Sequence, residues 1–270
     1  MQDRYAREQA FHNETFGVGE GKRFEAVSAF YSVSSSFVFY KQQLINLCGG
    51  GNVLEYGCGP GSSAFLLSQH AASVVGIDIS DVAITKAETQ AREEGLTNVA
   101  FQVMNAEDLR FPDSTFDLVC GSAILHHLDL RQSFAEISRV LKPNGVALFI
   151  EPLGHNLAIN LYRRATPDLR TIDEHPLLKR DFQLAEDYFH VIRPRFFQLL
   201  TFLAIPFRQR SFFRRLRLAL DRYDQHLFRL LPFMKWQAWQ VVLEFSKPNK
   251  PRRDQSPIAV PPAPSLQHFL

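Results

Sequence analysis

Three glycines alternate in the stretch VLEYGCGPGSS, which covers residues 53–63. They are Gly57, Gly59 and Gly61, and they lie between an apolar run and a helical pattern. Glycine lacks a Cβ atom, so a ligand can lie directly against the main chain of such a turn. The free N–H groups at the start of the following helix, near Ser62, favour negative charge. The stretch therefore predicts a nucleotide-binding turn.

Two acidic residues narrow the choice of nucleotide. Asp78 ends the run VVGID about 20 residues after the turn, where a carboxylate can accept hydrogen bonds from both ribose hydroxyls. A helix cap before DVAI is the alternative for Asp78, and the distance from the glycine turn favours ribose binding. Glu55 makes the pattern E-x-G-x-G-x-G instead of the dinucleotide pattern G-x-G-x-x-G. An acid beside the turn opposes a pyrophosphate and suits a ligand that carries positive charge or amino donors.

From residue 52 to about 151, apolar strands alternate with amphipathic helices. The expected strands are NVLEYG, SVVGIDIS, VAFQVMN, STFDLVCGSAI and VALFIEP. This alternation predicts an α/β fold with a parallel sheet and helices on both faces. Ligands of such a sheet bind beyond the carboxyl ends of its strands.

Four stretches, in order and spacing, resemble class I S-adenosylmethionine-dependent methyltransferases. They are VLEYGCGPG, VVGIDIS, NAEDLRFPDSTFDLVCGSAILHHL and EISRVLKPNGVALFIEP, and the resemblance covers roughly residues 40–151. The most similar subgroup is the small-molecule methylases typified by ubiquinone and menaquinone biosynthesis. The resemblance implies a Rossmann-like seven-stranded sheet whose last two strands form an antiparallel hairpin. It also implies S-adenosyl-L-methionine as the cofactor.

The resemblance implies nine cofactor-binding residues: Glu55, Gly57, Gly59, Gly61, Asp78, Ile79, Asn105, Ala106 and Ser122. Glu55, the glycine turn and Ser122 would line the methionine half of the cofactor. Asp78 would hold the ribose, and Ile79 would pack on the adenine. Asn105 and the small Ala106 would read the adenine edge. The family usually has an aspartate at the position of Asn105, whose amide oxygen accepts a hydrogen bond without charge assistance.

The sulfonium of S-adenosylmethionine already activates the methyl group, so the enzyme mainly has to position the acceptor and exclude water. A general base is needed only where the acceptor holds its proton tightly. We expect acid/base residues in the loops EPLGHN and DEHP, namely Glu151, His155 and His175, with loop hydrogen bonds as the alternative. His126 and His127 are expected to pack or cap the start of a helix. No metal site is assigned.

The chain divides into three predicted parts, with two helical segments inside the second. These are an N-terminal helical cover at 1–51, a methyltransferase domain at 52–247 with substrate-side or inserted segments at 152–187 and 198–235, and a disordered tail at 248–270. The second inserted segment lies in a region rich in leucine, phenylalanine and arginine. Between Arg193 and Leu230 the chain has nine arginines and two aspartates.

Residues 196–233 of this region have four interpretations. Apolar side chains beside arginines can lie in a membrane interface, cover a hydrophobic acceptor pocket, or contact another chain. They can also pack on the domain with the arginines in solvent.

The composition limits the class of protein. The net charge of +2 gives no indication of nucleic-acid binding. The three cysteines lack the spacing of a zinc site or a disulfide framework, which fits a reducing compartment. The N-terminus is too polar for a signal peptide, and no apolar run is long enough to cross a bilayer. We therefore expect a cytoplasmic protein, and contact with a membrane surface through residues 196–233 stays one of the four interpretations of that region.

The sequence thus predicts an S-adenosylmethionine-dependent methyltransferase that acts on a small acceptor, either hydrophobic or lipid-linked. The alternatives are a nicotinamide-dependent Rossmann oxidoreductase and a non-catalytic S-adenosylmethionine-binding module.

Overall fold

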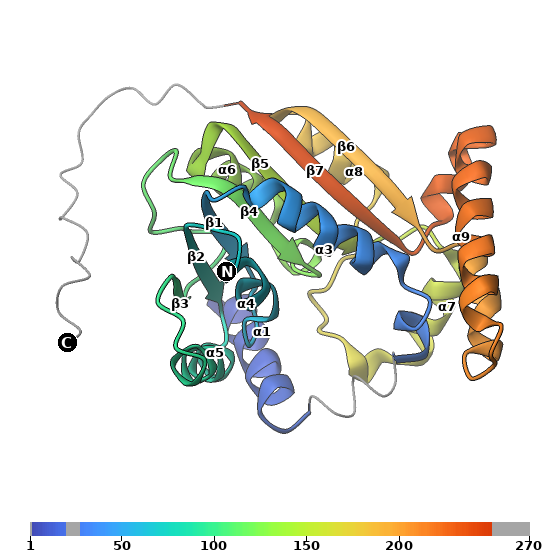
Figure 1. The fold of residues 1–270 in the computed structure, drawn as a ribbon, viewed down its shortest axis with the longest axis horizontal. Coiled ribbons are helices and arrows are strands. Elements are labelled where there is room, and N and C mark those ends of the chain that lie inside the picture. Colours follow the sequence, from blue (N-terminus) through green and yellow to red (C-terminus); the bar gives the residue numbers. More distant parts are fainter. Residues whose placement is uncertain (1, 20–27, 250–270) are drawn as a thin grey trace.

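The computed structural model describes residues 2–19 and 28–249 (Figure 1). Its centre is a seven-stranded sheet of order β3-β2-β1-β4-β5-β7-β6. The strands are β1 Asn52–Tyr56, β2 Ser73–Asp78, β3 Val99–Val103, β4 Phe116–Ser122, β5 Leu141–Pro152, β6 Phe189–Phe197 and β7 Gln240–Pro248. Strands β1 to β5 pair in parallel, and β7 pairs antiparallel with both β5 and β6. The predicted Rossmann-like seven-stranded sheet is confirmed.

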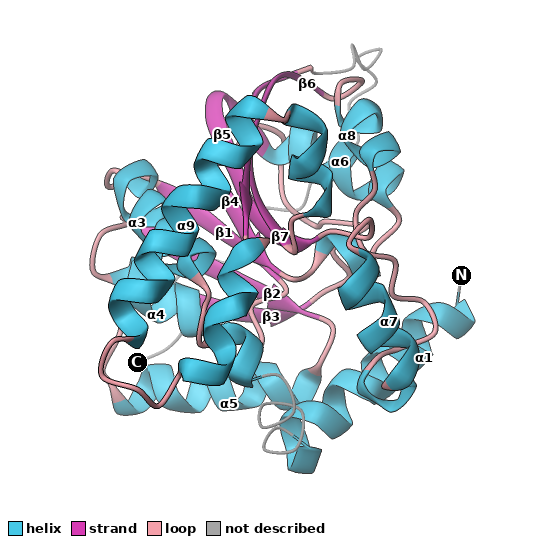
Figure 2. Cartoon of the chain, turned by 90° about the vertical axis from the view of Figure 1, so that its right-hand side faces the viewer, coloured by secondary structure: helices cyan, strands magenta, loops and turns pink. Residues whose placement is uncertain are grey.

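Helices cover both faces of the sheet (Figures 1 and 2). The α-helices with described bounds are α1 Gln2–Glu14, α3 Ser35–Cys48, α4 Ser62–Ser68, α5 Asp81–Glu93, α6 Leu130–Val140, α7 Leu157–Ala165, α8 Lys179–Ala185 and α9 Phe213–Leu230. The 3₁₀ and π-helical segments are η1 Thr15–Gly19, η2 Leu125–His127, η3 Pro167–Leu169, η4 Leu200–Phe207 and η5 Pro232–Gln237. In the part of the chain that the structure describes, each helix is too short or too polar to cross a bilayer.

Two apolar cores hold the helices against the sheet. Side chains of α3, α4 and α5, such as Leu44 and Leu67, pack on one face. Side chains of α6 and α8, such as Phe134 and Ala185, pack on the other. Fully burying a side chain the size of leucine or phenylalanine contributes about 1.5–3 kcal/mol. These cores fix the strands in register, and the register fixes where each strand ends.

The last two strands enclose a helical insertion. The segments η4, α9 and η5 all lie between β6 and β7, and α9 stands beyond the edge of the sheet, at the right of Figure 1. Asp224 of α9 is buried and accepts hydrogen bonds from the backbone N–H groups of Leu199 and Leu200 at 3.0 and 2.7 Å. The Thr201 hydroxyl also donates to Asp224, at 2.8 Å. The predicted helical insertion is therefore confirmed.

The two ends of the chain differ from each other. Residues 2–19 are helical and lie near the carboxyl edge of the sheet, as described below. At the other end, β7 extends to Pro248, so the strand includes the first residue of the predicted disordered tail. Residues 250–270 of that tail lie outside the described residues.

Candidate active site at the carboxyl edge of the sheet

The glycine turn between β1 and α4 requires its glycines. Gly57, Gly59 and Gly61 have φ angles of +59°, +51° and +93°, a region that L side chains rarely adopt. A Cβ atom on Gly57 would lie 2.7 Å from the Ile124 side chain, and one on Gly59 would lie 3.2 Å from the Phe16 ring. The turn therefore needs glycine for two reasons: its backbone has positive φ angles, and neighbouring side chains leave no room for a Cβ atom.

Asp78, at the carboxyl end of β2, lies against this turn. One of its carboxylate oxygens accepts from the Gly59 N–H, and the other accepts from the Ser80 N–H, both at 2.8 Å. Ser80 caps α5, because its hydroxyl accepts from the Ala83 N–H at 3.1 Å. Asp78 is therefore not the helix cap, and its carboxylate links the glycine turn to the end of the neighbouring strand.

Glu55 is buried beneath the turn. Its carboxylate accepts from the Ala64 N–H at 2.8 Å, at the start of α4. Burial raises the pKa of Glu55 to about 8, although hydrogen bonds from Ser63 and Ala64 act in the opposite direction. Glu55 thus fixes the helix that follows the turn.

A cavity of about 550 Å³ opens at the carboxyl ends of β1, β2 and β4. Six of the nine predicted cofactor residues line it: Gly57, Asp78, Ile79, Asn105, Ala106 and Ser122. The other three, Glu55, Gly59 and Gly61, shape the turn behind the cavity wall. The Asn105 amide oxygen accepts from the Glu107 N–H at 3.0 Å, so it also orders the loop after β3. The structure therefore brings the residues of the predicted cofactor set together at one end of the sheet.

The three predicted catalytic residues are described, and none of them is among the residues that line this cavity. Glu151 is fully buried and accepts from the Ile124 and Leu125 N–H groups at 2.9 and 2.8 Å. Its second oxygen lies 2.7 Å from His126 Nδ1. Burial raises the pKa of Glu151 to about 7, against the effect of the two N–H donors. These contacts give Glu151 a structural task, which is to anchor the loop after β4.

His155 and His175 lie in the segment between β5 and β6, and neither lines the cavity. The His155 Nε2 atom accepts from the Lys179 N–H at 3.1 Å, and its ring packs against Trp236. His175 is exposed, and its backbone N–H donates to the His126 carbonyl at 2.8 Å. Their catalytic roles stay predictions, while the contacts in the structure are those of loop stabilisation.

Helix α1 covers the cavity, and side chains along its length bind the loops at the sheet edge. Arg4 pairs with Glu107 after β3, and Gln9 donates to the Ile79 carbonyl after β2 at 2.9 Å. Asn13 donates to Asp81 at 2.7 Å. Phe16 in η1 and Tyr5 in α1 line the cavity. The N-terminal segment is therefore a wall of the site.

Three polar side chains outside the predicted set of site residues line the cavity together. They are Glu8 and His12 of α1 and His127 of η2. One Glu8 oxygen lies 3.2 Å from His127 Nδ1 and 3.5 Å from His12 Nε2. In the sequence, the only indication of this group was that Glu8 and His12 are four residues apart, because such residues share one face of a helix. Their partner His127 lies more than 100 residues away in the sequence, and the sequence predicted only a packing role for it.

The charge state of Glu8 follows from these neighbours. Burial raises its pKa, but His12, His127 and Thr171 outweigh burial and hold the pKa below the usual range of a carboxyl group. Glu8 is therefore an ionised carboxylate facing a partly apolar cavity.

Comparisons with known proteins agree with this geometry. Residues 54–149 match the family model described as "Methyltransferase domain". The "Uncharacterized methyltransferase YcgJ" of Bacillus subtilis is 37% identical over 100 residues, which are 37% of this chain and 40% of that protein. The "Sterol 24-C-methyltransferase erg6" of Aspergillus fumigatus is 35% identical over 127 residues, 46% of this chain and 34% of that protein. The matched part thus spans less than half the length of these curated relatives.

Solved structures share the fold over a longer stretch. The crystal structure of YcgJ from Bacillus subtilis has a TM-score of 0.52 at 19% identity and covers 78% of this chain and 99% of that one. Geranyl diphosphate C-methyltransferase from Streptomyces coelicolor, in complex with Mg²⁺, geranyl diphosphate and S-adenosyl-L-homocysteine, has a TM-score of 0.56 at 17% identity. It covers 78% of this chain and 80% of that one. These matches concern the methyltransferase domain as a whole and do not single out the ubiquinone and menaquinone subgroup.

Proposed function

We propose, from the premise that residues 54–149 form a class I S-adenosylmethionine-dependent methyltransferase domain, that the protein transfers a methyl group from S-adenosyl-L-methionine to a small hydrophobic or lipid-linked acceptor. The observation that carries the proposal is the convergence of Gly57, Asp78, Asn105 and Ser122 on one cavity. These residues come from the ends of three neighbouring strands and from the loop after β3. A single nucleoside ligand could contact all of them.

The chain's own residues would hold the cofactor through its polar groups. The Asp78 carboxylate is fixed by the Gly59 and Ser80 N–H groups, and its remaining lone pairs can accept from the ribose hydroxyls. Bound S-adenosylmethionine would supply an activated methyl group on its sulfonium. The protein would then place the acceptor in line with that methyl group and exclude water.

The rest of the cavity favours an apolar acceptor. Its wall includes the apolar or aromatic side chains of Tyr5, Phe16, Tyr31, Ile124 and Leu128. Two of the three proteins described above are named for sterol or geranyl diphosphate substrates. Most ligand pockets are lined by apolar side chains with a few polar groups that fix orientation. Here the polar groups that α1 and η2 contribute to the cavity include Glu8, His12 and His127.

The test is a radiolabelled methyl-transfer assay with lipid and metabolite extracts of the host as acceptors. The wild type should label an organic-soluble product. Asp78→Ala should lose at least about 100-fold in S-adenosylhomocysteine affinity, because it removes a buried charged acceptor of two backbone donors. Undiminished labelling by Asp78→Ala would show that the cofactor site is elsewhere.

Two rival functions predict different results in ligand-binding and methyl-transfer assays. A nicotinamide oxidoreductase would show a thermal shift with NAD and none with S-adenosylhomocysteine. A non-catalytic module would bind S-adenosylmethionine without turnover on any acceptor. The acid next to the glycine turn disfavours the first rival, and the apolar part of the cavity, which extends beyond the cofactor residues, disfavours the second.

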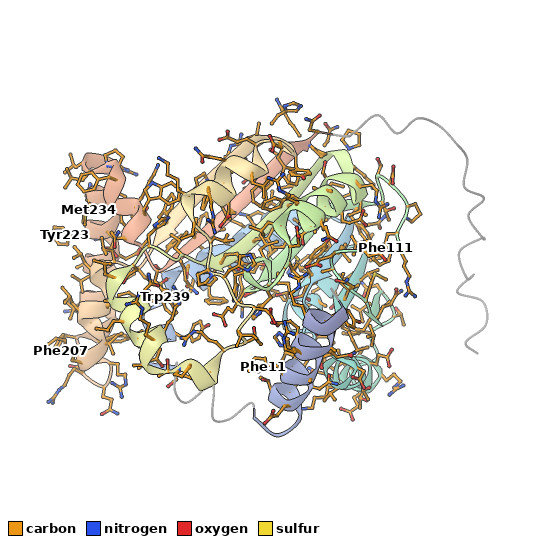
Figure 3. The ribbon with its side chains drawn as sticks, turned by 180° about the vertical axis from the view of Figure 1, so that it is seen from behind. Phe11, Phe111, Phe207, Tyr223, Met234 and Trp239 are labelled. Carbon is orange, nitrogen blue, oxygen red and sulfur yellow. The ribbon has the colours of Figure 1, made fainter. Side chains whose placement is uncertain are left out.

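The helical insertion favours a membrane surface as the source of the acceptor. Exposed apolar side chains gather on η4, α9, η5 and the turns between them: Leu203, Phe207, Phe212, Leu218, Tyr223, Leu230, Leu231 and Phe233. Exposed arginines lie among them: Arg208, Arg210, Arg214, Arg215, Arg222 and Arg229. We call these two sets the apolar–arginine surface. Phe207 and Tyr223 lie at one edge of the molecule, away from the sheet (Figure 3). This combination suits the interface of an anionic membrane.

Co-sedimentation with vesicles tests this part of the proposal. The full chain should bind phosphatidylglycerol vesicles and bind neutral phosphatidylcholine vesicles less. The combined variant Phe207→Ser, Phe212→Ser and Phe233→Ser should lose binding, whereas Val38→Ser, an exposed apolar residue of α3, should not. Equal sedimentation of wild type and triple variant, or none by either, would contradict membrane contact through this surface.

A further inference from the structure

Helix α1 and η2 bring three metal-ligating side chains to one point of the cavity wall. Glu8, His12 and His127 each offer one ligand atom, and the three atoms all lie within 4.8 Å of one another. The distances from the Glu8 oxygen are 3.2 Å to His127 Nδ1 and 3.5 Å to His12 Nε2. In a tetrahedral zinc site with bonds of about 2.0–2.1 Å, neighbouring ligand atoms are roughly 3.3 Å apart. The two separations from the Glu8 oxygen, 3.2 and 3.5 Å, are close to this value.

The polar atoms of this group are poorly satisfied by the rest of the protein. Both carboxylate oxygens of Glu8, together with His127 Nδ1, are buried and have no aligned hydrogen-bond partner within residues 2–19 and 28–249. Buried polar atoms without partners cost free energy, and most have a hydrogen bond or a bound ion.

A second group that could hold an ion shares His127 and fits the cavity less well. It consists of His126, His127 and Glu174. His126 Nδ1 is already committed to Glu151 at 2.7 Å, and neither His126 nor Glu174 lines the cavity. All three members of the first group do line it.

We propose that Glu8, His12 and His127 bind one divalent transition-metal ion, with zinc the best match to two imidazoles and one carboxylate. Three protein ligands leave a fourth position, as in catalytic zinc sites. The position faces the cavity that the proposed function assigns to the acceptor. The ion would hold an oxygen or nitrogen atom of the acceptor there and so orient the acceptor toward the cofactor. This role of the ion rests on the proposed function, whereas the existence of the ion site does not.

The site also gives α1 a second means of attachment. Two of the ligands lie on α1 and the third lies on η2, which follows β4. An ion between them would join the N-terminal wall to the sheet edge, because metal binding adds its free energy to the folded arrangement that forms the site.

The first test is zinc titration of the chelator-stripped full chain in competition with a chromophoric chelator. The wild type should bind one equivalent. Glu8→Gln and His12→Gln should each weaken binding at least about 100-fold, since even outer-shell changes cost about 10–100-fold. His70→Gln is the matched control, because His70 is exposed and lies in another part of the chain. Zinc affinity that is equal in wild type and Glu8→Gln, or no zinc binding by the wild type at micromolar concentration, would overturn the proposal.

The second test does not depend on loss of binding. His127→Cys replaces one zinc ligand by another, and with Co²⁺ it should give a thiolate-to-cobalt absorption band that the wild type lacks. Absence of the band in a folded variant would also overturn the site. S-adenosylhomocysteine binding by the metal-free wild type, followed by thermal shift, tests the proposed function separately. Failure of the wild type to bind S-adenosylhomocysteine would count against the proposed function and not against the metal site.

Discussion

The two walls of the cavity are built in different ways. On one side, the ends of β1, β2 and β4 present the glycine turn, Asp78 and Ser122, and the parallel register of the sheet sets their positions. On the other side, α1 is held by side-chain contacts such as Arg4 with Glu107. The first wall depends on backbone geometry, and the second depends on contacts between segments far apart in the sequence. Substitutions should therefore affect the two walls differently.

We call the first wall, which carries the glycine turn, Asp78 and Ser122, the cofactor wall. The largest effect should come from a change in its backbone. Gly57→Val places a β-branched residue at a φ of +59° and drives its Cβ to within 2.7 Å of Ile124. We expect S-adenosylhomocysteine affinity to fall at least about 100-fold, which corresponds to roughly 2.7 kcal/mol. Isothermal titration calorimetry of the purified variant measures this.

The matched control separates the backbone conformation from the site. Gly95 has a similar φ of +65° but has no neighbour within 4 Å of an added Cβ, and it lies after α5. Gly95→Val should therefore lower stability without changing S-adenosylhomocysteine affinity. If Gly57→Val binds as well as the wild type, the glycine turn is not the cofactor wall.

The contrast between the walls also explains what the sequence could predict. The glycine turn and Asp78 are separated by one helix and one strand, so their spacing along the chain nearly determines their positions in space. Glu8 and His12 meet His127 only because α1 folds across the sheet edge. No spacing rule relates residues 2–14 to residues 125–127, so this half of the site could not be predicted.

Glu151 shows a second limit of sequence reasoning. Its position at the end of a buried strand correctly placed it at the edge of the sheet where cofactors bind. The position did not indicate that the loop at Ile124 and Leu125 folds toward the carboxylate and donates two N–H groups to one of its oxygens. Strand order can be predicted from alternating strands and helices, whereas the path of each loop depends on packing that the pattern does not contain.

The helical insertion is a second region held mainly by side chains, and a single buried group secures it. Asp224→Ala would leave the Leu199 and Leu200 N–H groups and the Thr201 hydroxyl without their acceptor. The expected loss in the free energy of unfolding is about 2.5 kcal/mol, or local opening of the insertion at similar cost. Urea denaturation and limited proteolysis between residues 199 and 237 measure the two effects. Asp224→Asn, which keeps one acceptor oxygen, should lose less.

Asp224→Ala also tests whether the helical insertion and the cofactor wall are independent, because it should leave the cofactor wall unchanged. S-adenosylhomocysteine affinity of Asp224→Ala should equal that of the wild type at temperatures where the domain is folded. A parallel loss of cofactor affinity would show that the insertion and the cofactor wall are not independent.

The smallest expected effect is a pH dependence of the cofactor wall itself. The pKa of Glu55 in the folded protein is about 8, against an ordinary value of 4.5, chiefly because the carboxyl is buried. Between these two values the folded state binds more protons than the unfolded state, so the free energy of unfolding falls as the pH rises. The stabilising contribution of protonated Glu55 is fully present below about pH 4.5 and is lost by about pH 8.

Glu55→Gln should remove this dependence, because its amide oxygen can still accept from Ala64 but does not titrate. We expect the variant to gain on the order of 2 kcal/mol relative to the wild type between pH 5 and pH 9, since local opening limits the penalty of the buried charge. Glu151, with a pKa of about 7, contributes the same trend to both proteins and cancels in the difference. Urea denaturation of the cofactor-free proteins across this range measures the gain, with Glu88→Gln on the exposed side of α5 as the control. Parallel pH profiles for wild type and Glu55→Gln would mean that Glu55 reaches water, and the backbone wall would then be less tightly closed than its hydrogen bonds indicate.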